Sequence, residues 1–273
     1  MNIITLNKSN VVIDTYNNKL IYRLNKQLED NKYRISLFSF SIPYSIPNIS
    51  SVYNNNTFQI KYNSITYDFT INEGFYDINT LNNYFKYIQK NTLALPYNIV
   101  NNIDTYFLEI VENTTYYSTQ LLLRKTVLSG TAGHPGTSTY NGKTFQIKFN
   151  GELATFLGFN KDVFYPPFEQ TIDYERLSKD DNLVPNLTPV FSINFNCNLI
   201  TNEFSNNFST IYSYVPLGVS YGSLMYNVIN PPLFFNSTMK TDKIIIDITD
   251  QDNNKIKFFD PNMTITLLIE PYK

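Results

Sequence analysis

The side chains that most often carry catalysis are scarce in this sequence. Its 273 residues include one histidine, His134, and one cysteine, Cys197. A Ser-His-Asp or Cys-His system needs a histidine held firmly beside its nucleophile, but His134 lies in residues 129–142, whose four glycines predict an exposed, mobile loop. A zinc site needs three or four histidine, cysteine or similar ligands, which this chain cannot supply. The glycines of 129–142 also do not lie between a strand and a helix as a phosphate-binding loop requires.

Acidic residues form short runs that resemble chemical motifs only superficially. Residues 250–254 begin like a calcium loop, but Lys255 replaces its glycine and Pro261 its bidentate glutamate. A hairpin turn explains that run better. Paired carboxylates for glycoside hydrolysis are defined in space, so Glu29-Asp30 and Asp180-Asp181 stay open, although a solvated surface explains both more simply. We predict no catalytic, cofactor-binding or metal-binding residue, no cofactor, and a protein that is not an enzyme.

The composition favours contacts with other proteins. Charged residues make up 16% of the chain, below the usual ~25%, while 22 tyrosines and 21 phenylalanines are present. Codon bias in an AT-rich genome explains the same composition equally well. The net charge is −2 and the basic residues are scattered, so we expect no direct nucleic-acid binding. The start of the chain does not resemble a signal peptide and no window of 18 residues is wholly apolar, which predicts an intracellular protein without a membrane span.

One amphipathic helix, about 77–90, stands out among segments that alternate like strands. Asp77 is its expected N-cap, and four apolar residues spaced by three or four form one stripe: Ile78, Leu81, Phe85 and Ile88. The opposite face is expected to be polar: Asn82, Asn83, Lys86 and Gln89. A second, short helix is expected at about 152–157, ended by Gly158.

The remaining periodicity predicts some ten short strands. They include a hairpin at 10–24, a strand at 33–42, a hairpin at 58–71, a pair at 106–111 and 121–127, and strands at 145–149, 190–196, 210–215, 224–229, 243–249 and 263–270. The turn at 250–255 is expected to join the last two as a hairpin. No internal repeat or linker demands a second domain.

These elements predict an all-β protein, a single jelly-roll β-sandwich with the two helices above and long ordered loops such as 160–189. We expect an N-terminal arm at 1–10 and one domain over 11–273, with the glycine-rich loop 129–142 exposed on it. Periodicity alone does not separate a jelly roll from other sandwiches.

Four segments occur in an order that points to a known family. They are the strand and proline turn at 35–43 with residues 47–49, the strand, Gly74-x-Tyr76 and helix unit at 71–82, the Leu-Gly-Phe helix stop at 156–159, and the C-terminal segments 244–256 and 264–269. Together they resemble the single-jelly-roll penton (vertex) capsid proteins of the lineage that includes adenoviruses, polinton-like viruses, adintoviruses and virophages. The short spacing between the first two segments and the absence of tryptophan leave the subfamily open.

This resemblance implies a structural protein of the virion that forms homopentamers at the icosahedral vertices and contacts the surrounding major capsid protein. We predict that the first residues reach neighbouring capsid subunits or the interior, although a frayed terminus explains them equally well: Met1, Asn2, Ile3, Ile4 and Thr5. His134 and Pro135, in the 129–142 loop, are expected to face the exterior or a neighbour.

Two alternatives remain. The chain could be another capsid component, a minor or major jelly-roll protein, although a double jelly roll needs a longer chain. It could also be a carbohydrate-binding β-sandwich, because solvent-facing tyrosine and phenylalanine stack on sugars. Such modules usually favour tryptophan, which this chain lacks.

Overall fold

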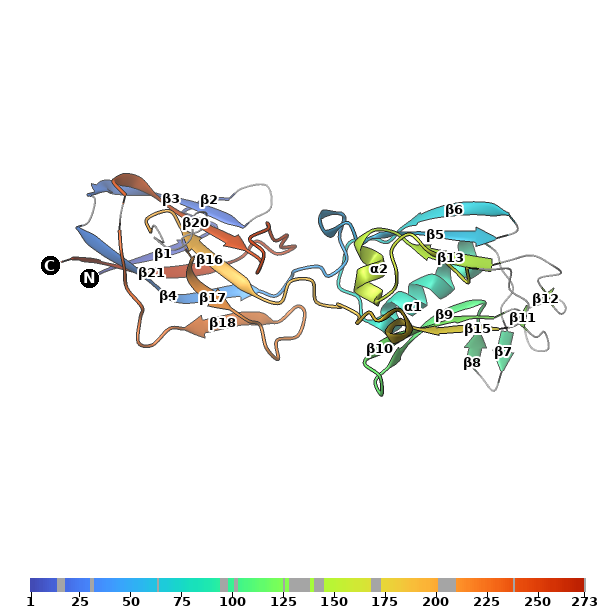
Figure 1. The fold of residues 1–273 in the computed structure, drawn as a ribbon. Coiled ribbons are helices and arrows are strands. Elements are labelled where there is room, and N and C mark those ends of the chain that lie inside the picture. Colours follow the sequence, from blue (N-terminus) through green and yellow to red (C-terminus); the bar gives the residue numbers. More distant parts are fainter. Residues whose placement is uncertain are drawn as a thin grey trace. The chain divides into compact units, whose positions relative to one another are not determined.

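The chain forms two compact units, each with its own core (Figure 1). The computed structural model describes residues 1–13, 18–29, 32–62, 64–93, 98–100, 103–124, 126–127, 138–139, 145–167, 173–200, 210–237 and 239–272. Unit 1 comprises Met1–Pro47 and Val190–Lys273, and unit 2 comprises Asn48–Pro189. The sequence predicts one domain over 11–273, and the structure differs because the apolar faces of 48–189 are buried against one another in a separate cluster.

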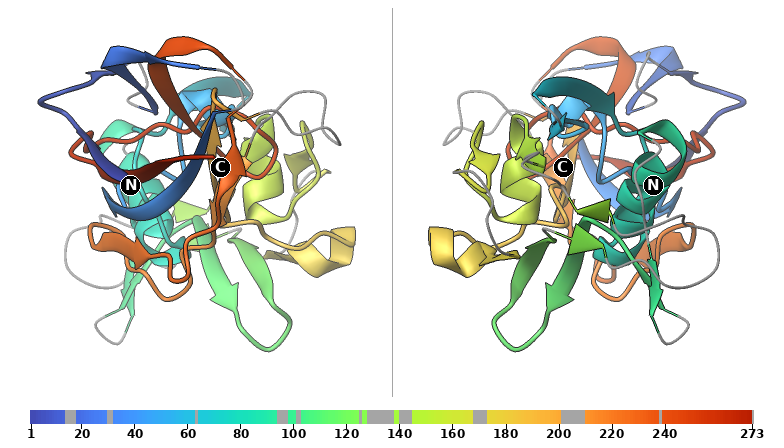
Figure 2. Two further views of the ribbon diagram at one scale, coloured as in Figure 1. Left: turned by 90° about the vertical axis from the view of Figure 1, so that its left-hand side faces the viewer. Right: turned by 90° about the vertical axis from the view of Figure 1, so that its right-hand side faces the viewer.

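Unit 1 is built from two antiparallel sheets. The first has the order β1-β21-β4-β18, with a short strand β19 also on β4: β1 (Asn2–Asn7), β21 (Thr264–Pro271), β4 (Tyr33–Pro43), β18 (Leu224–Val228) and β19 (Phe235–Asn236). The second has the order β17-β16-β20-β3-β2: β17 (Thr210–Tyr214), β16 (Ile193–Cys197), β20 (Thr241–Thr249), β3 (Lys19–Leu28) and β2 (Val12–Ile13). The first and last strands, β1 and β21, lie side by side (Figures 1 and 2).

The strand order of unit 1 is that of a jelly roll. When its eight main strands are lettered B to I along the chain (β1, β3, β4, β16, β17, β18, β20, β21), the two sheets read B-I-D-G and C-H-E-F. Phe40 of the first sheet packs on Phe195 of the second, with ring centroids 4.8 Å apart, so the sheets form a sandwich. The predicted all-β jelly-roll class is therefore confirmed, and the jelly roll is confined to unit 1.

Unit 2 lies within the chain between strands β4 and β16, the D and E strands of the jelly roll. One of its sheets has the order β14-β13-β5-β6: β14 (Phe164–Tyr165), β13 (Phe145–Phe149), β5 (Thr57–Tyr62) and β6 (Ile65–Thr70). Another has the order β15-β10-β9: β15 (Tyr174–Leu177), β10 (Ser118–Leu123) and β9 (Leu108–Asn113). Two short pairs and three short helical segments complete it: β7 (Asn98–Val100) with β8 (Ile103–Thr105), β11 (Thr126–Val127) with β12 (Ser138–Thr139), η1 (Ser51–Tyr53), η3 (Ser178–Asp181) and α2 (Glu152–Leu157).

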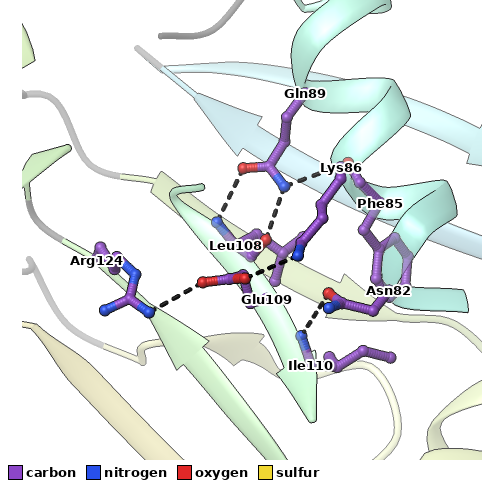
Figure 3. A network of polar contacts seen from close by, with 8 residues as sticks. All are labelled: Asn82, Phe85, Lys86, Gln89, Leu108, Glu109, Ile110 and Arg124. Atoms are coloured by element: carbon purple, nitrogen blue, oxygen red, sulfur yellow. Dashed lines mark hydrogen bonds and ion pairs between the residues drawn. The ribbon is translucent and has the colours of Figure 1, made fainter. Parts of the chain in front are cut away.

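Helix α1 (Ile78–Tyr87), followed by a π-helical turn η2 (Ile88–Thr92), lies between these two sheets (Figure 1). Phe85 packs on Phe58 of β5, with ring centroids 5.0 Å apart, and on Phe149 of β13. On its other side the helix meets β9 through polar groups (Figure 3). The Gln89 amide donates to the Leu108 carbonyl (2.7 Å) and accepts from the Leu108 N–H (2.9 Å). The helix thus satisfies backbone groups of a strand edge that would otherwise be unpaired.

Several local predictions are confirmed. The Asp77 carboxylate accepts from the Thr80 N–H (2.7 Å), and the Thr80 hydroxyl accepts from the Asp77 N–H (2.9 Å), which completes a capping box. Helix α2 ends at Gly158, whose φ of 78° is left-handed. The hairpins at 10–24 and 58–71 and the pair at 106–127 form as β2-β3, β5-β6 and β9-β10.

Other predictions fail where the fold depends on distant segments. The main helix braces unit 2 and not the jelly roll, and Asn82 and Gln89 of its expected polar face are buried because they bind β9. The turn at 250–255 does not join a hairpin, since β20 and β21 belong to opposite sheets. Its Asp250 carboxylate instead accepts from backbone N–H groups within the turn. Loop 129–142 lies outside the described residues except for the two residues of β12.

Candidate assembly surface

The predicted interaction residues at the start of the chain form an edge strand. Residues 2–7 form β1 and pair with β21, so the prediction of an N-terminal arm is wrong for them. The apolar side chains at 265–269 give β1 a strand on which it packs and with which it pairs. Met1 and Ile3 are exposed, whereas Asn2 and Ile4 line a cavity of about 170 Å³ together with residues of β3. His134 and Pro135 lie outside the described residues.

The opposite edge of the same sheet is β18, and it carries an exposed apolar row. Leu224, Tyr226 and Val228 alternate along the strand and are 57%, 62% and 41% exposed, while Met225 between them is fully buried. The sequence predicts this strand but not the exposed row, because Leu-Met-Tyr-Asn-Val gives no sign of which face is covered. The one sign of an exposed apolar row in the sequence is that apolar residues occur on both faces of this strand.

Ladder register places residues from four of the five strands of this sheet, β1, β21, β4 and β18, on one outward face. Tyr226 is paired with Ser41, Ser41 with Thr264, and Thr264 with Asn7. A parallel row runs from Val228 through Ser39 and Thr266 to Thr5. Directly paired residues share a face, so these eight residues form what we call the outer sheet face. Thr5, one of the predicted interaction residues, belongs to it.

The outer sheet face contains no charged residue. Its members are serine, threonine, asparagine, tyrosine and valine, and Leu224 extends it along β18. These strands do carry one charged pair, Arg34 and Glu270, but it lies toward the other end of β4. There the Arg34 guanidinium also covers the ring of Phe234, 4.7 Å from its centroid. Depletion of charged residues is typical of the core of protein–protein interfaces.

The loop before β18 adds further exposed apolar side chains. Leu217 is 83% exposed, and Val215 and Tyr221 are also exposed. Backbone bonds hold the end of this loop beside β4: the Gly222 N–H donates to the Tyr44 carbonyl (2.9 Å), and the Tyr44 N–H donates to the Ser223 carbonyl (2.8 Å). These bonds fix the backbone where the loop enters β18.

Buried carboxylates in unit 2 form structural contacts. Glu109 binds Lys86 of α1 at 3.1 Å and Arg124 at 2.9 Å, so each of its oxygens has a cationic partner (Figure 3). Asp181 accepts from the Tyr165 hydroxyl (2.8 Å) and pairs with Arg176. Burial, with a contribution from Asp181, raises the pKa of Tyr165. Both carboxylates therefore hold elements of unit 2 together through fixed partners.

The single cysteine is also embedded in structure. Cys197 ends β16 and is 1% exposed, and burial raises the pKa of its thiol to about 12. A thiol with that pKa remains protonated near neutral pH and is a poor nucleophile. Among the residues that the structure describes, no three histidine, cysteine, aspartate or glutamate side chains gather as metal ligands. None of the helices in the described ranges has the length and apolar character needed to cross a membrane.

Comparison with known proteins adds little to these observations. No protein-family model matches the sequence, and no curated protein matches it. Among solved structures, the crystal structure of selenomethionine-labelled mavirus penton protein matches over 100% of both chains, with 14% sequence identity and a TM-score of 0.39. A TM-score this low carries no argument about fold or function, so the jelly-roll assignment rests on the strand pairing of unit 1.

Proposed function

We propose that this protein is a structural capsid protein of a virus, a penton-type vertex subunit that forms homopentamers and contacts the surrounding major capsid protein in the virion. The observation that carries the proposal is the B-I-D-G and C-H-E-F strand order of unit 1. Jelly rolls of this kind build viral capsids, but they also occur in lectins and cupins. The four sequence segments that resemble vertex proteins favour the capsid among these.

A closed ring requires two different surfaces on each subunit. Cyclic assemblies of more than two copies use heterologous contacts, in which one patch meets a different patch of the next copy. The first sheet of unit 1 offers two distinct open edges, β1 and β18, joined by the uncharged outer sheet face. A specific contact of this kind buries about 800 Å² per partner. We propose that Tyr226 and Val228 contribute to the contact with the neighbouring copy.

The alternatives predict different assemblies. A minor or major capsid component would bind other capsid proteins without forming a pentamer of its own. A carbohydrate-binding β-sandwich would act as a monomer with exposed aromatic side chains. A monomeric carbohydrate-binding protein does not explain why an edge strand presents an uncharged apolar row, which is a risk of aggregation unless a partner covers it. The oligomeric state distinguishes the penton-type subunit from another capsid component.

Native mass spectrometry and negative-stain microscopy of the purified full chain test the proposal. We expect a pentameric mass and fivefold rosettes. Tyr226→Glu places a charge in the row and should shift the mass to monomer, while the circular dichroism spectrum shows that the subunit remains folded. Tyr87→Glu is the matched control, since Tyr87 is 60% exposed on α1 and should leave the pentamer intact. A strictly monomeric wild-type protein contradicts the vertex function, and a pentamer that survives Tyr226→Glu contradicts the assigned contact.

A further inference from the structure

A cavity of about 180 Å³ opens in unit 2 at the first turn of α1. It is bounded by the helix start at Ile78, by the β9-β10 hairpin and by residues 185–188, which follow η3. One water molecule needs only about 10–15 Å³ of such space, so the cavity has room for a ligand. It is smaller than the roughly 300–1,000 Å³ of pockets for drug-sized molecules, which limits that ligand to about one ring.

The cavity exists because the helix is shorter than the strands beneath it. On the face of β9-β10 that meets α1, the paired residues are Leu108 with Leu123, Ile110 with Leu121, and Glu112 with Thr119. Gln89 of η2 bonds to Leu108, and Asn82 in the middle of the helix accepts from the Ile110 N–H. The third row then coincides with the start of the helix, and beyond Ile78 no turn of α1 remains to cover it.

That third row presents polar groups without partners. Thr119 is 1% exposed, and its hydroxyl makes no hydrogen bond. Glu112 lines the same cavity from an exposed position, and within the described part of the chain its carboxylate has no hydrogen bond to the protein and no ion pair. A buried hydroxyl without a partner destabilises a fold, so its presence at a cavity wall points to a ligand that completes it.

The rest of the wall combines apolar side chains and an aromatic ring with polar side chains at positions 113, 118, 186 and 188. Ile78 is buried and Leu187 is half-buried, and both line the cavity. Tyr117 lines it from the hairpin turn, is 75% exposed, and has a left-handed φ of 49°. That conformation is uncommon for a residue other than glycine. The turn holds an aromatic ring at the edge of the cavity.

The charge of the lining selects the chemistry of the ligand. Glu112 is the only charged residue among those that line the cavity, which disfavours anions such as phosphate, sulfate or a sialic acid. A carboxylate, a hydroxyl and an aromatic ring beside apolar side chains instead match a molecule with hydroxyl groups on its rim and C–H groups on its face.

We propose that this cavity binds one neutral pyranose sugar residue. Sugar hydroxyls donate to the Glu112 carboxylate and bond with the Thr119 hydroxyl, and the C–H face of the ring packs on Tyr117 and Leu187. The proposal concerns unit 2 alone and does not depend on vertex assembly.

Titration of the full-length protein with free sugars, followed by ¹H–¹⁵N NMR, tests the site. The probes are glucose, galactose, mannose, N-acetylglucosamine and N-acetylgalactosamine, with N-acetylneuraminic acid as the anionic comparison. We expect at least one neutral sugar to shift amide signals of residues 112–119 and 186–188, and the anion to shift none. An array of glycans that carry the same sugar at terminal or internal positions then shows whether the site also binds that sugar as part of a glycan, and at which of the two positions.

Two variants separate binding from folding. Thr119→Val keeps the buried volume and removes the unpartnered hydroxyl, so the melting temperature should not fall while Kd rises about five- to tenfold. Glu112→Gln should raise Kd about ten- to a hundredfold, because bonds to a charged acceptor are stronger. Matched controls outside the cavity should leave Kd unchanged: Thr66→Val on β6 and Glu175→Gln on β15.

The proposal is overturned if none of the five neutral sugars shifts those signals, if both variants bind as the wild type does, or if the anionic sugar binds more tightly. A pentamer without sugar binding contradicts this site and leaves the vertex function standing. A monomer that binds sugar contradicts the vertex function and leaves this site standing.

Discussion

The strongest prediction concerns Gln89, whose side chain takes the place of a neighbouring strand for β9. It is 1% exposed, and its amide satisfies both the N–H and the carbonyl of Leu108, which is itself fully buried. Replacement by leucine keeps a side chain of similar size but leaves both backbone groups without partners. Its third bond, to the Phe85 carbonyl at 3.2 Å, matters less because that carbonyl also accepts from the Ile88 N–H.

The size of the effect follows from these contacts. An unsatisfied buried donor or acceptor costs about 1–3 kcal/mol, so the two groups together cost about 2–6 kcal/mol. Burial of leucine methyl groups in place of an amide returns about 1–2 kcal/mol. The midpoints of these two ranges predict that Gln89→Leu lowers the free energy of unfolding of unit 2 by about 2.5 kcal/mol. For a unit of this size, that corresponds to a fall of roughly 5–10 °C in melting temperature.

Urea unfolding of both proteins, with native-state hydrogen exchange of the Leu108 amide, measures the change. Exchange at Leu108 should accelerate in the variant. Asn83→Leu is the control, because Asn83 lies on the same helix but is exposed, and its replacement should alter stability by less than about 0.5 kcal/mol. If Gln89→Leu is as stable as the wild type and Leu108 remains protected, the helix does not satisfy β9 in the way described.

Three further predictions test local features of the fold. Gly158→Ala should destabilise unit 2 by more than about 1 kcal/mol in urea unfolding, because φ is 78° and a Cβ would lie 2.8 Å from Ser178 Cβ; an unchanged midpoint would contradict that conformation. The Thr80 hydrogen bonds lower the pKa of Asp77 in the folded protein below its ordinary 3.8. The stability that the Asp77 charge adds is therefore complete above pH 3.8, and it is lost as the pH falls through the lowered pKa of the folded protein. Wild type should therefore exceed Asp77→Ala by about 1 kcal/mol at pH 7, and the difference should shrink in acid; a difference independent of pH would refute it. Cys197 should react with a thiol reagent at pH 8 only after unfolding, and rapid labelling of the native protein would show that the thiol is not buried.

The features that the sequence predicts correctly are those that depend on neighbours along the chain. Asp77 and Thr80 lie three residues apart, and Gly158 follows its helix directly, so both helix boundaries are local signals. The β5-β6 hairpin is local for the same reason. The jelly-roll class follows from the abundance of strands together with the resemblance at 35–269.

The remaining features depend on pairings that periodicity does not encode. The division into two units requires knowledge that β4 pairs with β21 and β18, whose residues come after the whole of unit 2. The exposed row of β18 follows from its position at a sheet edge. Asn82 and Gln89 have the same polarity as exposed Asn83, and only the approach of β9 distinguishes them.

Unit 2 is inserted in the sequence between strands β4 and β16 of the jelly roll, and this fixes the order in which the two units are completed during synthesis on the ribosome. Unit 2 is one continuous segment, so all its strands are available before residue 190 is made. The jelly roll has to wait, because β21 lies between β1 and β4 and is the last strand produced. Until β21 is made, β1 and β4 lack the strand that pairs with both of them. More than two hundred residues separate the end of β4 from the start of β21. A nascent chain that stops before β21 would therefore carry a complete unit 2 beside an unclosed sandwich, with the apolar faces of β1 and β4 open to chaperones.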